Sequence, residues 1–364
     1  MALVRQEWFL GVTLATCLAL LLREESQPHG AVGPLAQGLV AAWLFAVILG
    51  SAICVVRHAE ALAHRLGEPY GALILTLSVT SIEVMSLSAL TAQPDSDPTL
   101  VRDTLFSVVM IILNGMVGLS LLSGAWRHTE QQYNLQGANT YLGLIIPLAV
   151  LSLVMPDFTR TTSGPTLSTG QETFLIVMAL ALYALFLVVQ TGRHRGYFSL
   201  DAAGPPTEAH PGDPPALARH AVLLVVYMLP VAFLAEHLAH PVDYAIQALH
   251  APAALSGMMI AVLVATPEAL GAVRAAVANR LQQAVNIFLG SVLSTIALTV
   301  PAMLLISYLT GRHLILGLEH SDFVMLLLTL AVSVVTFASG RTNVLQGAVH
   351  LLLFAAYILL MFQN

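Results

Sequence analysis

Long apolar runs, separated by short polar or Pro/Gly-rich breaks, follow one another along the whole chain. A bilayer core about 30 Å thick needs about 20 mostly apolar residues in each spanning helix. Runs near that length predict helices over residues 7–22, 33–57, 68–92, 99–124, 139–155, 171–191, 218–240, 249–272, 282–308, 319–338 and 343–361. The pattern therefore predicts an all-α integral membrane protein of about eleven transmembrane helices.

The first run is short enough to be the core of a cleaved signal peptide. Arg23, Glu24 and Glu25 stand directly after it, where a cleavage site would carry small residues. We therefore expect the segment 1–32 to hold a retained extra helix ahead of the other ten.

Composition agrees with a membrane protein, because 57% of the 364 residues are hydrophobic and only 9% are charged. Soluble domains carry roughly 25% charged residues. The net charge of -6 is too small to indicate a nucleic-acid partner, so we expect membrane lipid around the chain and no nucleic acid. Cys17 and Cys54 lie in apolar runs, which indicates neither a disulfide framework nor a metal motif.

The arginines are distributed unequally between the two sides of the predicted membrane helices. One side carries Arg5, Arg57, Arg65, Arg127, Arg193, Arg195, Arg219, Arg274, Arg280 and Arg341, and the other carries Arg23, Arg102, Arg160 and Arg312. Cytoplasmic loops of membrane proteins are enriched in positive residues. The distribution predicts a multi-pass protein of the cell inner membrane with a cytoplasmic N-terminus and, after eleven crossings, an outside C-terminus.

The longest polar interruption, residues 192–217, contains five prolines and would lie in the cytoplasm. Such a segment cannot bury enough apolar surface to fold alone, so we expect a flexible linker between two halves. The alternative is a regulatory or cation-sensing loop that uses His194, Asp201, Glu208, His210 and Asp213.

The halves, 33–191 and 218–364, share an order of parts. Residues 59–64 (AEALAH) and 235–240 (AEHLAH) agree at five of six positions, and each precedes an apolar helix with one glutamate, Glu83 or Glu268. The next helix of each half carries amide and small residues, namely Asn114-Gly115, and Asn286 with Gly290-Ser291. Five helices per half is an odd number, so the second half would enter the membrane inverted. Transporters are often built from two such inverted five-helix repeats.

Glu83 and Glu268 lie about fifteen and nineteen residues into their predicted helices. A carboxylate near the bilayer centre costs several kcal/mol, so an ionisable residue there is a functional candidate by default. Hard cations prefer oxygen ligands. Thr80, Ser81, Thr266, Asn114 and Ser291 would supply further oxygens, and Pro267 would free a backbone carbonyl one turn earlier. Interhelical packing contacts remain an alternative for Asn114, Asn286 and Ser291.

Burial favours the protonated form of a carboxyl group, so protons would compete with a cation at the two deep glutamates. That competition is what an antiporter requires, because an empty charged site is too costly to reorient. Glu60 and Glu236 lie near helix ends on opposite sides of the membrane and would guide ions or protons. The alternative for these two is simple contact with water.

The segments 58–83 (HAEALAHRLGEPYGALILTLSVTSIE) and 262–302 (VLVATPEALGAVRAAVANRLQQAVNIFLGSVLSTIALTVPA) resemble the two repeats of the calcium/cation antiporter superfamily. The closest likeness is to its calcium/proton exchangers and their bacterial calcium(sodium, potassium)/proton branch. The resemblance covers nearly the whole chain. It implies that Glu83 and Glu268 bind the cation and exchange protons, and that Glu60 and Glu236 belong to the ion and proton paths.

The chain departs from that family at one place. Many calcium/proton exchangers carry Gly-Asn-Ala just before each glutamate, whereas this chain carries Thr80-Ser81-Ile82 and Thr266-Pro267. The absent amides leave calcium, sodium and potassium all open as the transported cation.

The sequence therefore predicts a secondary antiporter that exchanges a cation, calcium first, for protons, with no cofactor besides the transported ions. One alternative is a sodium(potassium)/proton antiporter with little calcium activity, and another is an ion channel. An intramembrane enzyme would need a nucleophile with a base or a metal-ligand pair, and motifs of that kind do not occur. The residues do not indicate an oligomeric state.

Overall fold

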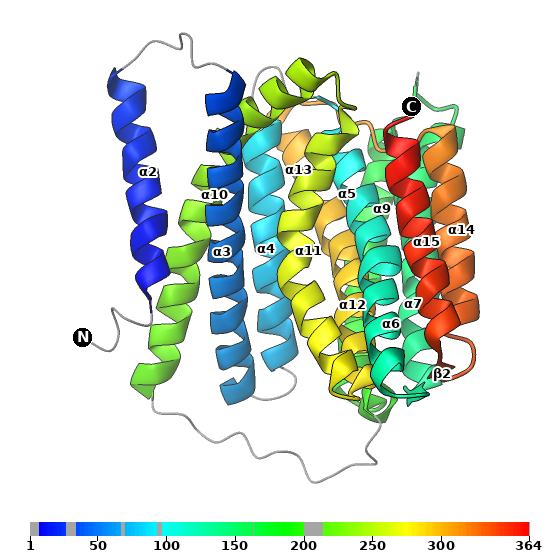
Figure 1. Cartoon of the computed structure of the whole chain (residues 1–364). Coiled ribbons are helices and arrows are strands. Elements are labelled where there is room, and N and C mark those ends of the chain that lie inside the picture. The colour runs from blue at the N-terminus through cyan, green and yellow to red at the C-terminus, as the bar shows by residue number, and fades with distance from the viewer. Residues whose placement is uncertain are drawn as a thin grey trace. The chain divides into compact units, whose positions relative to one another are not determined.

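The computed structural model describes residues 7–26, 34–66, 70–92, 97–162, 164–199 and 214–363 (Figure 1). The chain separates into two compact units, one from Met1–Ser96 and Glu208–Ser256 and the other from Asp97–Thr207 and Gly257–Asn364. Each unit thus combines one segment from the first half of the sequence with one from the second half. Of the proposed regulatory loop residues, Asp201, Glu208, His210 and Asp213 lie outside the described residues.

The described part of the first unit consists of long helices, namely α2 (Trp8–Ser26), α3 (Pro34–Leu66), α4 (Tyr70–Thr91) and α10 (Pro214–Leu249). α3 packs along both α4 and α10, and α2 packs against α3 and α10 (Figure 1). A hydroxyl pair ties α2 to α3, since Thr13 Oγ1 lies 2.9 Å from Ser51 Oγ. The predicted first helix is therefore an integral part of this unit.

α3 and α10 extend beyond the apolar runs that predict them. Those runs end at residues 57 and 240, whereas the helices end at Leu66 and Leu249. The residues after the first run, HAEALAHRL, are mostly strong helix formers, so α3 continues after the hydropathy falls. The residues after the second run, PVDYAIQAL, begin with Pro241, which lies inside α10. The predicted ends were wrong because lipid thickness limits an apolar run but does not limit a helix.

The second unit is built on three long helices that each change from α to π geometry and back. They are α5–η1–α6 (Leu100–Met110, Ile111–Met116, Val117–Arg127), α7–η2–α8 (Leu135–Ala149, Val150–Val154, Met155–Phe158) and α12–η4–α13 (Leu281–Ser294, Thr295–Thr299, Val300–Thr310). The other helices are α9 (Thr169–Thr191), the 3-10 turn η3 (Arg195–Phe198), α11 (Ala254–Val277), α14 (His320–Thr336) and α15 (Val344–Met361).

Prolines account for two of the π segments. A proline ring collides with the carbonyl four residues earlier in an α-helix. For Pro301 that carbonyl belongs to Ala297 in η4, and for Pro156 it belongs to Ser152 in η2. The wider π turn accommodates the ring without breaking the helix. η1 contains no proline but holds Asn114, and π segments are frequent at functional sites.

Polar residues fix the ends of the helices in the second unit. Ser168 with Gln171 forms a capping box at the start of α9, and Asn343 with Gln346 forms one at the start of α15. α13 ends at Gly311, whose positive φ of 68° suits a left-handed helix terminus. A two-stranded antiparallel pair, β1 (Gln131–Gln132) and β2 (Arg341–Thr342), links the loops after α6 and α14.

The described residues form eleven continuous helical stretches close to the predicted ranges, and eight of them are long and apolar enough to cross a membrane. α2, α4 and α14 contribute shorter apolar stretches. The prediction of an all-α membrane protein is confirmed. The division into an N-terminal helix (1–32), two repeats (33–191 and 218–364) and a linker (192–217) stays a prediction.

A polar cluster at the start of α2 joins three helices of the first unit. Glu7 Oε2 lies 2.5 Å from an Arg57 nitrogen and 3.4 Å from His58 Nε2, both on α3. Tyr227 of α10 donates its hydroxyl to the same oxygen at 3.1 Å. Burial alone would raise the pKa of the Glu7 carboxyl, but the charge of Arg57 and the bond from Tyr227 outweigh it and hold the pKa below its ordinary value.

Glu7→Gln should therefore destabilise the protein at pH 7 by on the order of 1 kcal/mol. Because the folded pKa lies below the unfolded one, the stabilisation is complete above the unfolded pKa of about 4.5 and is lost as the pH falls through the folded pKa. Thermal unfolding in detergent between pH 7 and pH 3 measures this difference. Glu130→Gln, which changes an exposed residue paired with Arg341, is the control. A Glu7→Gln deficit that persists unchanged at the acid end would contradict the assignment.

Candidate functional site

Glu83 lies in the middle of α4 and is fully buried, with 0% of its surface exposed. Thr80, three residues earlier, is on the same helix face and is also buried. Ser81, two residues earlier, points about 200° away around the helix. Ser86, three residues later, shares the face with Glu83 and is buried too. Helix geometry thus favours Thr80 over Ser81 as a companion of Glu83 and adds Ser86, which the sequence analysis missed.

Glu268 lies on α11 and is half-buried. The hydroxyl of Ser291, a buried residue of α12, donates a hydrogen bond to Glu268 Oε2. Both residues belong to the second unit, so this bond joins α11 to α12 within it. The structure thus brings together two of the residues predicted as cation ligands.

The backbone of α11 is irregular in its bonding just before Glu268. Pro267 has no N–H, so the carbonyl of Leu263 lacks its usual partner in the helix. Thr266 donates its hydroxyl to the carbonyl of Val262 at 2.5 Å. Thr266 therefore uses its proton within the helix, and its hydroxyl oxygen and the carbonyl of Leu263 are the groups left to accept a cation or a proton donor.

Asn114, in η1, is fully buried and belongs to a polar network of the second unit. Its Nδ2 donates to Thr329 Oγ1 of α14 at 2.8 Å, and its Oδ1 lies 3.3 Å from His350 Nδ1 of α15. The sequence analysis missed both neighbours. His350 could have been found there, because it is an ionisable residue within an apolar run.

Asn286, the amide of the second half in the repeat comparison, holds the loop after α9. It donates to the carbonyl of Phe198 at 2.8 Å and accepts from Gln282 at 2.9 Å. The bond to Phe198 is a packing contact between α12 and η3, and amides in membrane helices often form such contacts.

Glu60 and Glu236 are exposed on α3 and α10 and lie inside these helices rather than at their ends. His58 Nδ1 lies 3.0 Å from His220 Nδ1, so the end of α3 lies beside the start of α10 and the helices are antiparallel. At 1.5 Å per residue this register separates Glu60 and Glu236 by about 27 Å along the helix axes. The separation is close to the thickness of a bilayer core.

Among the described residues, no three His, Cys, Asp or Glu side chains gather where they could hold a metal ion. A cation bound at Glu83 or Glu268 would therefore need hydroxyl, amide or backbone oxygens to complete its shell.

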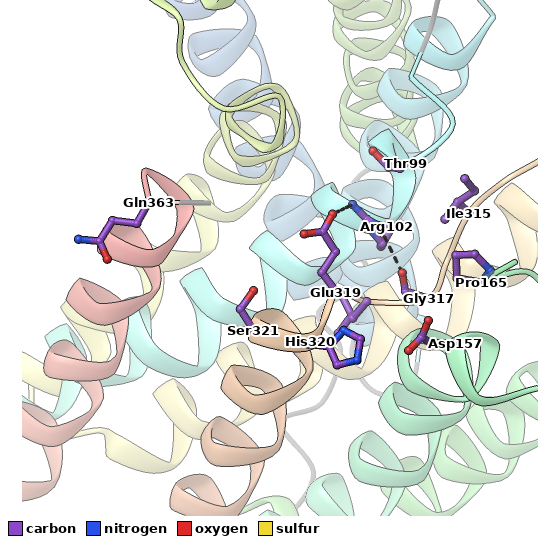
Figure 2. A pocket seen from close by; sticks show the side chains of 11 residues that line it. Thr99, Arg102, Asp157, Pro165, Ile315, Gly317, Glu319, His320, Ser321 and Gln363 are labelled. Atoms are coloured by element: carbon purple, nitrogen blue, oxygen red, sulfur yellow. Dashed lines mark hydrogen bonds and ion pairs between the residues drawn. The ribbon is translucent and has the colours of Figure 1, made fainter.

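A pocket of about 840 Å³ opens at one end of the second unit (Figure 2). Asp157, Glu319, His320 and Arg102 are among its lining residues. The described lining includes none of the predicted cation ligands. Gly317 lies at a close crossing in its wall, since a Cβ there would stand 2.9 Å from the backbone nitrogen of Asp157.

Arg102 organises the wall of this pocket. Its side chain is only 9% exposed, and its Nε donates to Asp103 Oδ1 at 2.7 Å. It also donates to the carbonyl of Gly317 at 3.3 Å and lies 3.6 Å from Glu319, as Figure 2 shows. The guanidinium thus fastens the segment before α14 to the first turn of α5.

Comparison with known proteins agrees with this architecture. A sequence model of the family described as "Sodium/calcium exchanger protein" matches residues 37–192 and 219–363. The sodium-potassium/proton antiporter ChaA of Escherichia coli (strain K12) is 42% identical over 319 residues, which is 86% of each chain. The Ca(2+)/H(+) antiporter ChaA of Bacillus subtilis (strain 168) is 24% identical over 87% of this chain and 90% of that one.

Among solved structures, native YfkE is similar with a TM-score of 0.74 at 18% identity, and the match covers 98% of this chain and 100% of that chain. This likeness concerns the fold, which extends over the entire second protein.

Arg102→Gln should lower the midpoint of thermal unfolding in detergent, because it leaves the buried Asp103 carboxylate without its cation. Breaking one side of a buried ion pair costs about 3–5 kcal/mol. Glu319→Gln is the matched control: its side chain is 63% exposed, and the change should cost less than about 1 kcal/mol. Equal losses in the two variants would show that the Arg102–Asp103 pair does not stabilise this end of the unit.

Proposed function

This chain belongs to the sodium/calcium exchanger protein family, and on that premise we propose that it is a secondary transporter that exchanges a cation for protons across the cell inner membrane. The observation that carries the proposal is the complete burial of Glu83 in the apolar helix α4. A second glutamate, Glu268 of the apolar helix α11, accepts a hydrogen bond from Ser291 of α12. Both matched ChaA relatives are named as antiporters that move protons.

In the proposed mechanism, Glu83 and Glu268 alternately bind the cation and protons. A buried carboxylate is costly unless a positive charge accompanies it, so the site changes the side to which it opens only when each glutamate is protonated or holds a cation. Release of a cation on one side requires uptake of protons before the return step. This requirement couples the two fluxes and excludes uncoupled leak.

Ser291 is the best supported of the proposed additional ligands, because its hydroxyl already contacts Glu268. Thr80 follows, since it is buried on the same face of α4 as Glu83. Ser81, Thr266 and Asn114 complete the proposed set, with Asn114 held in a π segment. Glu60 and Glu236 are proposed to stand at the two ends of the ion and proton path, in keeping with their axial separation.

The inverted-repeat organisation and the cytoplasmic N-terminus remain part of the proposal. One feature of the described helices supports the repeat. The helices that follow the two glutamate helices in sequence, Leu100–Arg127 and Leu281–Thr310, both contain a π segment near the middle. Corresponding irregularities in two halves are the expected mark of transporters built from repeats.

Sodium or potassium is a second candidate for the main cation, beside calcium. The relative named for sodium and potassium is 42% identical, whereas the relative named for calcium is 24% identical. The absence of amides just before Glu83 and Glu268 also favours sodium or potassium over calcium. Initial antiport rates with each cation in everted membrane vesicles decide between them.

Glu83→Gln and Glu268→Gln should each reduce cation-dependent proton release in such vesicles by more than about tenfold. An amide cannot carry the exchanged proton, and loss of a charged ligand exceeds the roughly 1.4 kcal/mol that corresponds to tenfold. Glu130→Gln, outside the membrane helices, should leave the rate unchanged. Full activity of both test variants would refute the site, and cation flux without a coupled proton flux would identify a channel.

Ser291→Ala should raise the cation concentration for half-maximal antiport several-fold without abolishing transport, because the carboxylate of Glu268 remains. Ser294→Ala is the matched control, since Ser294 is one turn away on α12, is also buried and donates to the carbonyl of Ser291. An equal effect of the two changes would indicate a general packing defect in α12.

A further inference from the structure

His350 is a buried ionisable residue that the proposed mechanism leaves without a role. It lies near the middle of α15, whose other residues are almost all apolar, and its exposure is 0%. A histidine placed at such depth is costly unless its ring nitrogens are bonded. Two polar side chains, Asn114 and Thr336, and the backbone carbonyl of Leu113 meet that need.

The contacts of His350 form one directed series of hydrogen bonds. Asn114 Oδ1 can only accept, so His350 Nδ1 carries the hydrogen across their 3.3 Å contact. His350 Nε2 then accepts from the hydroxyl of Thr336 at 2.9 Å. On the far side, Asn114 Nδ2 donates to Thr329 Oγ1 at 2.8 Å, and Thr329 donates to the sulfur of Met110 at 3.6 Å.

Two glycines allow α15 to come close enough for this contact. A Cβ on Gly347 would stand 2.7 Å from the backbone nitrogen of Leu122, and one on Gly118 would stand 2.9 Å from the backbone nitrogen of Leu351. Side chains larger than hydrogen would separate α6 from α15 at this crossing. Gly347 lies one turn before His350, and Gly118 one turn after Asn114, so the close approach is centred on the pair.

We propose that His350 is a positioning residue for the cation site: it holds the Asn114 amide with its oxygen and nitrogen in fixed directions within η1. The inference rests on the proposed function, in which Asn114 is a ligand. An amide oxygen has two lone pairs, so the bond from His350 leaves one for a cation. Groups that orient a ligand in this way affect affinity without touching the ion.

Two substitutions of His350 separate orientation of Asn114 from mere packing. His350→Asn keeps a donor at the position of Nδ1, next to Asn114, whereas His350→Gln places its amide at the position of Nε2, next to Thr336. Both remove the titratable ring. The half-saturating cation concentration in everted vesicles should stay within about threefold for His350→Asn and rise about tenfold for His350→Gln, the effect of one lost hydrogen bond. Equal shifts, or no shift in either, would overturn the proposal.

An isosteric pair tests the same idea if a His350 variant does not accumulate in the membrane. Thr329→Val removes the hydroxyl partner of Asn114 Nδ2, leaving only its contact with the sulfur of Met110, and should raise the half-saturating concentration several-fold. Thr336→Val removes only the bond to His350 Nε2 and should change that concentration less than about twofold. The reverse order would overturn the proposal.

Asn114→Ala distinguishes this inference from the proposed function. If Asn114→Ala leaves the cation affinity unchanged while Glu83→Gln and Glu268→Gln abolish antiport, the positioning role of His350 fails and the glutamate site stands. In the Asn114→Ala background, His350→Gln should have no further effect on affinity, because the group that it positions is gone.

Discussion

The structure depends on one constraint, the cost of burying polar and charged groups in an apolar interior. A charge or an amide removed from water must find a partner within the protein. Arg102 meets Asp103 and the carbonyl of Gly317, Glu268 meets Ser291, and Asn114 meets Thr329 and His350. The contacts of Arg102 with Gly317 and of Asn114 with Thr329 and His350 join segments that are distant in the sequence. Satisfying buried polar groups therefore also determines which helices pack together.

The backbone obeys the same constraint. Where a proline or a π segment disturbs the regular bonding of a helix, carbonyl groups become available that a regular α-helix would use internally. In this chain such disturbances lie next to residues proposed to handle the cation: Pro267 precedes Glu268, η1 contains Asn114, and η4 follows Ser291 on the same helix. Irregular backbone at membrane depth is tolerated where neighbouring protein satisfies it.

These features give a consistent account of proton-coupled exchange. In the proposed mechanism, a carboxylate in an apolar helix changes between two neutralised states, one protonated and one with a cation, and hydroxyl and amide oxygens adjust how strongly the cation competes. Under this proposal, selectivity would depend on the few oxygens around each glutamate and on the groups that orient them, such as Ser291 beside Glu268 and His350 beside Asn114. Hydroxyls in place of family amides near the glutamates are where this chain would differ from a calcium/proton exchanger.

The sequence by itself determined the all-α membrane class, the helices within a few residues and the two deep glutamates, because apolar length and isolated charges are local properties of the chain. It did not determine the extension of α3 to Leu66 and of α10 to Leu249, because the length of an apolar run does not fix where a helix ends. Only the tertiary structure gave Asn286 a packing contact with Phe198 and revealed His350 as the partner of Asn114. Those outcomes depend on which helices lie side by side, and contacts between segments more than 80 residues apart leave no mark in the local pattern of a single chain.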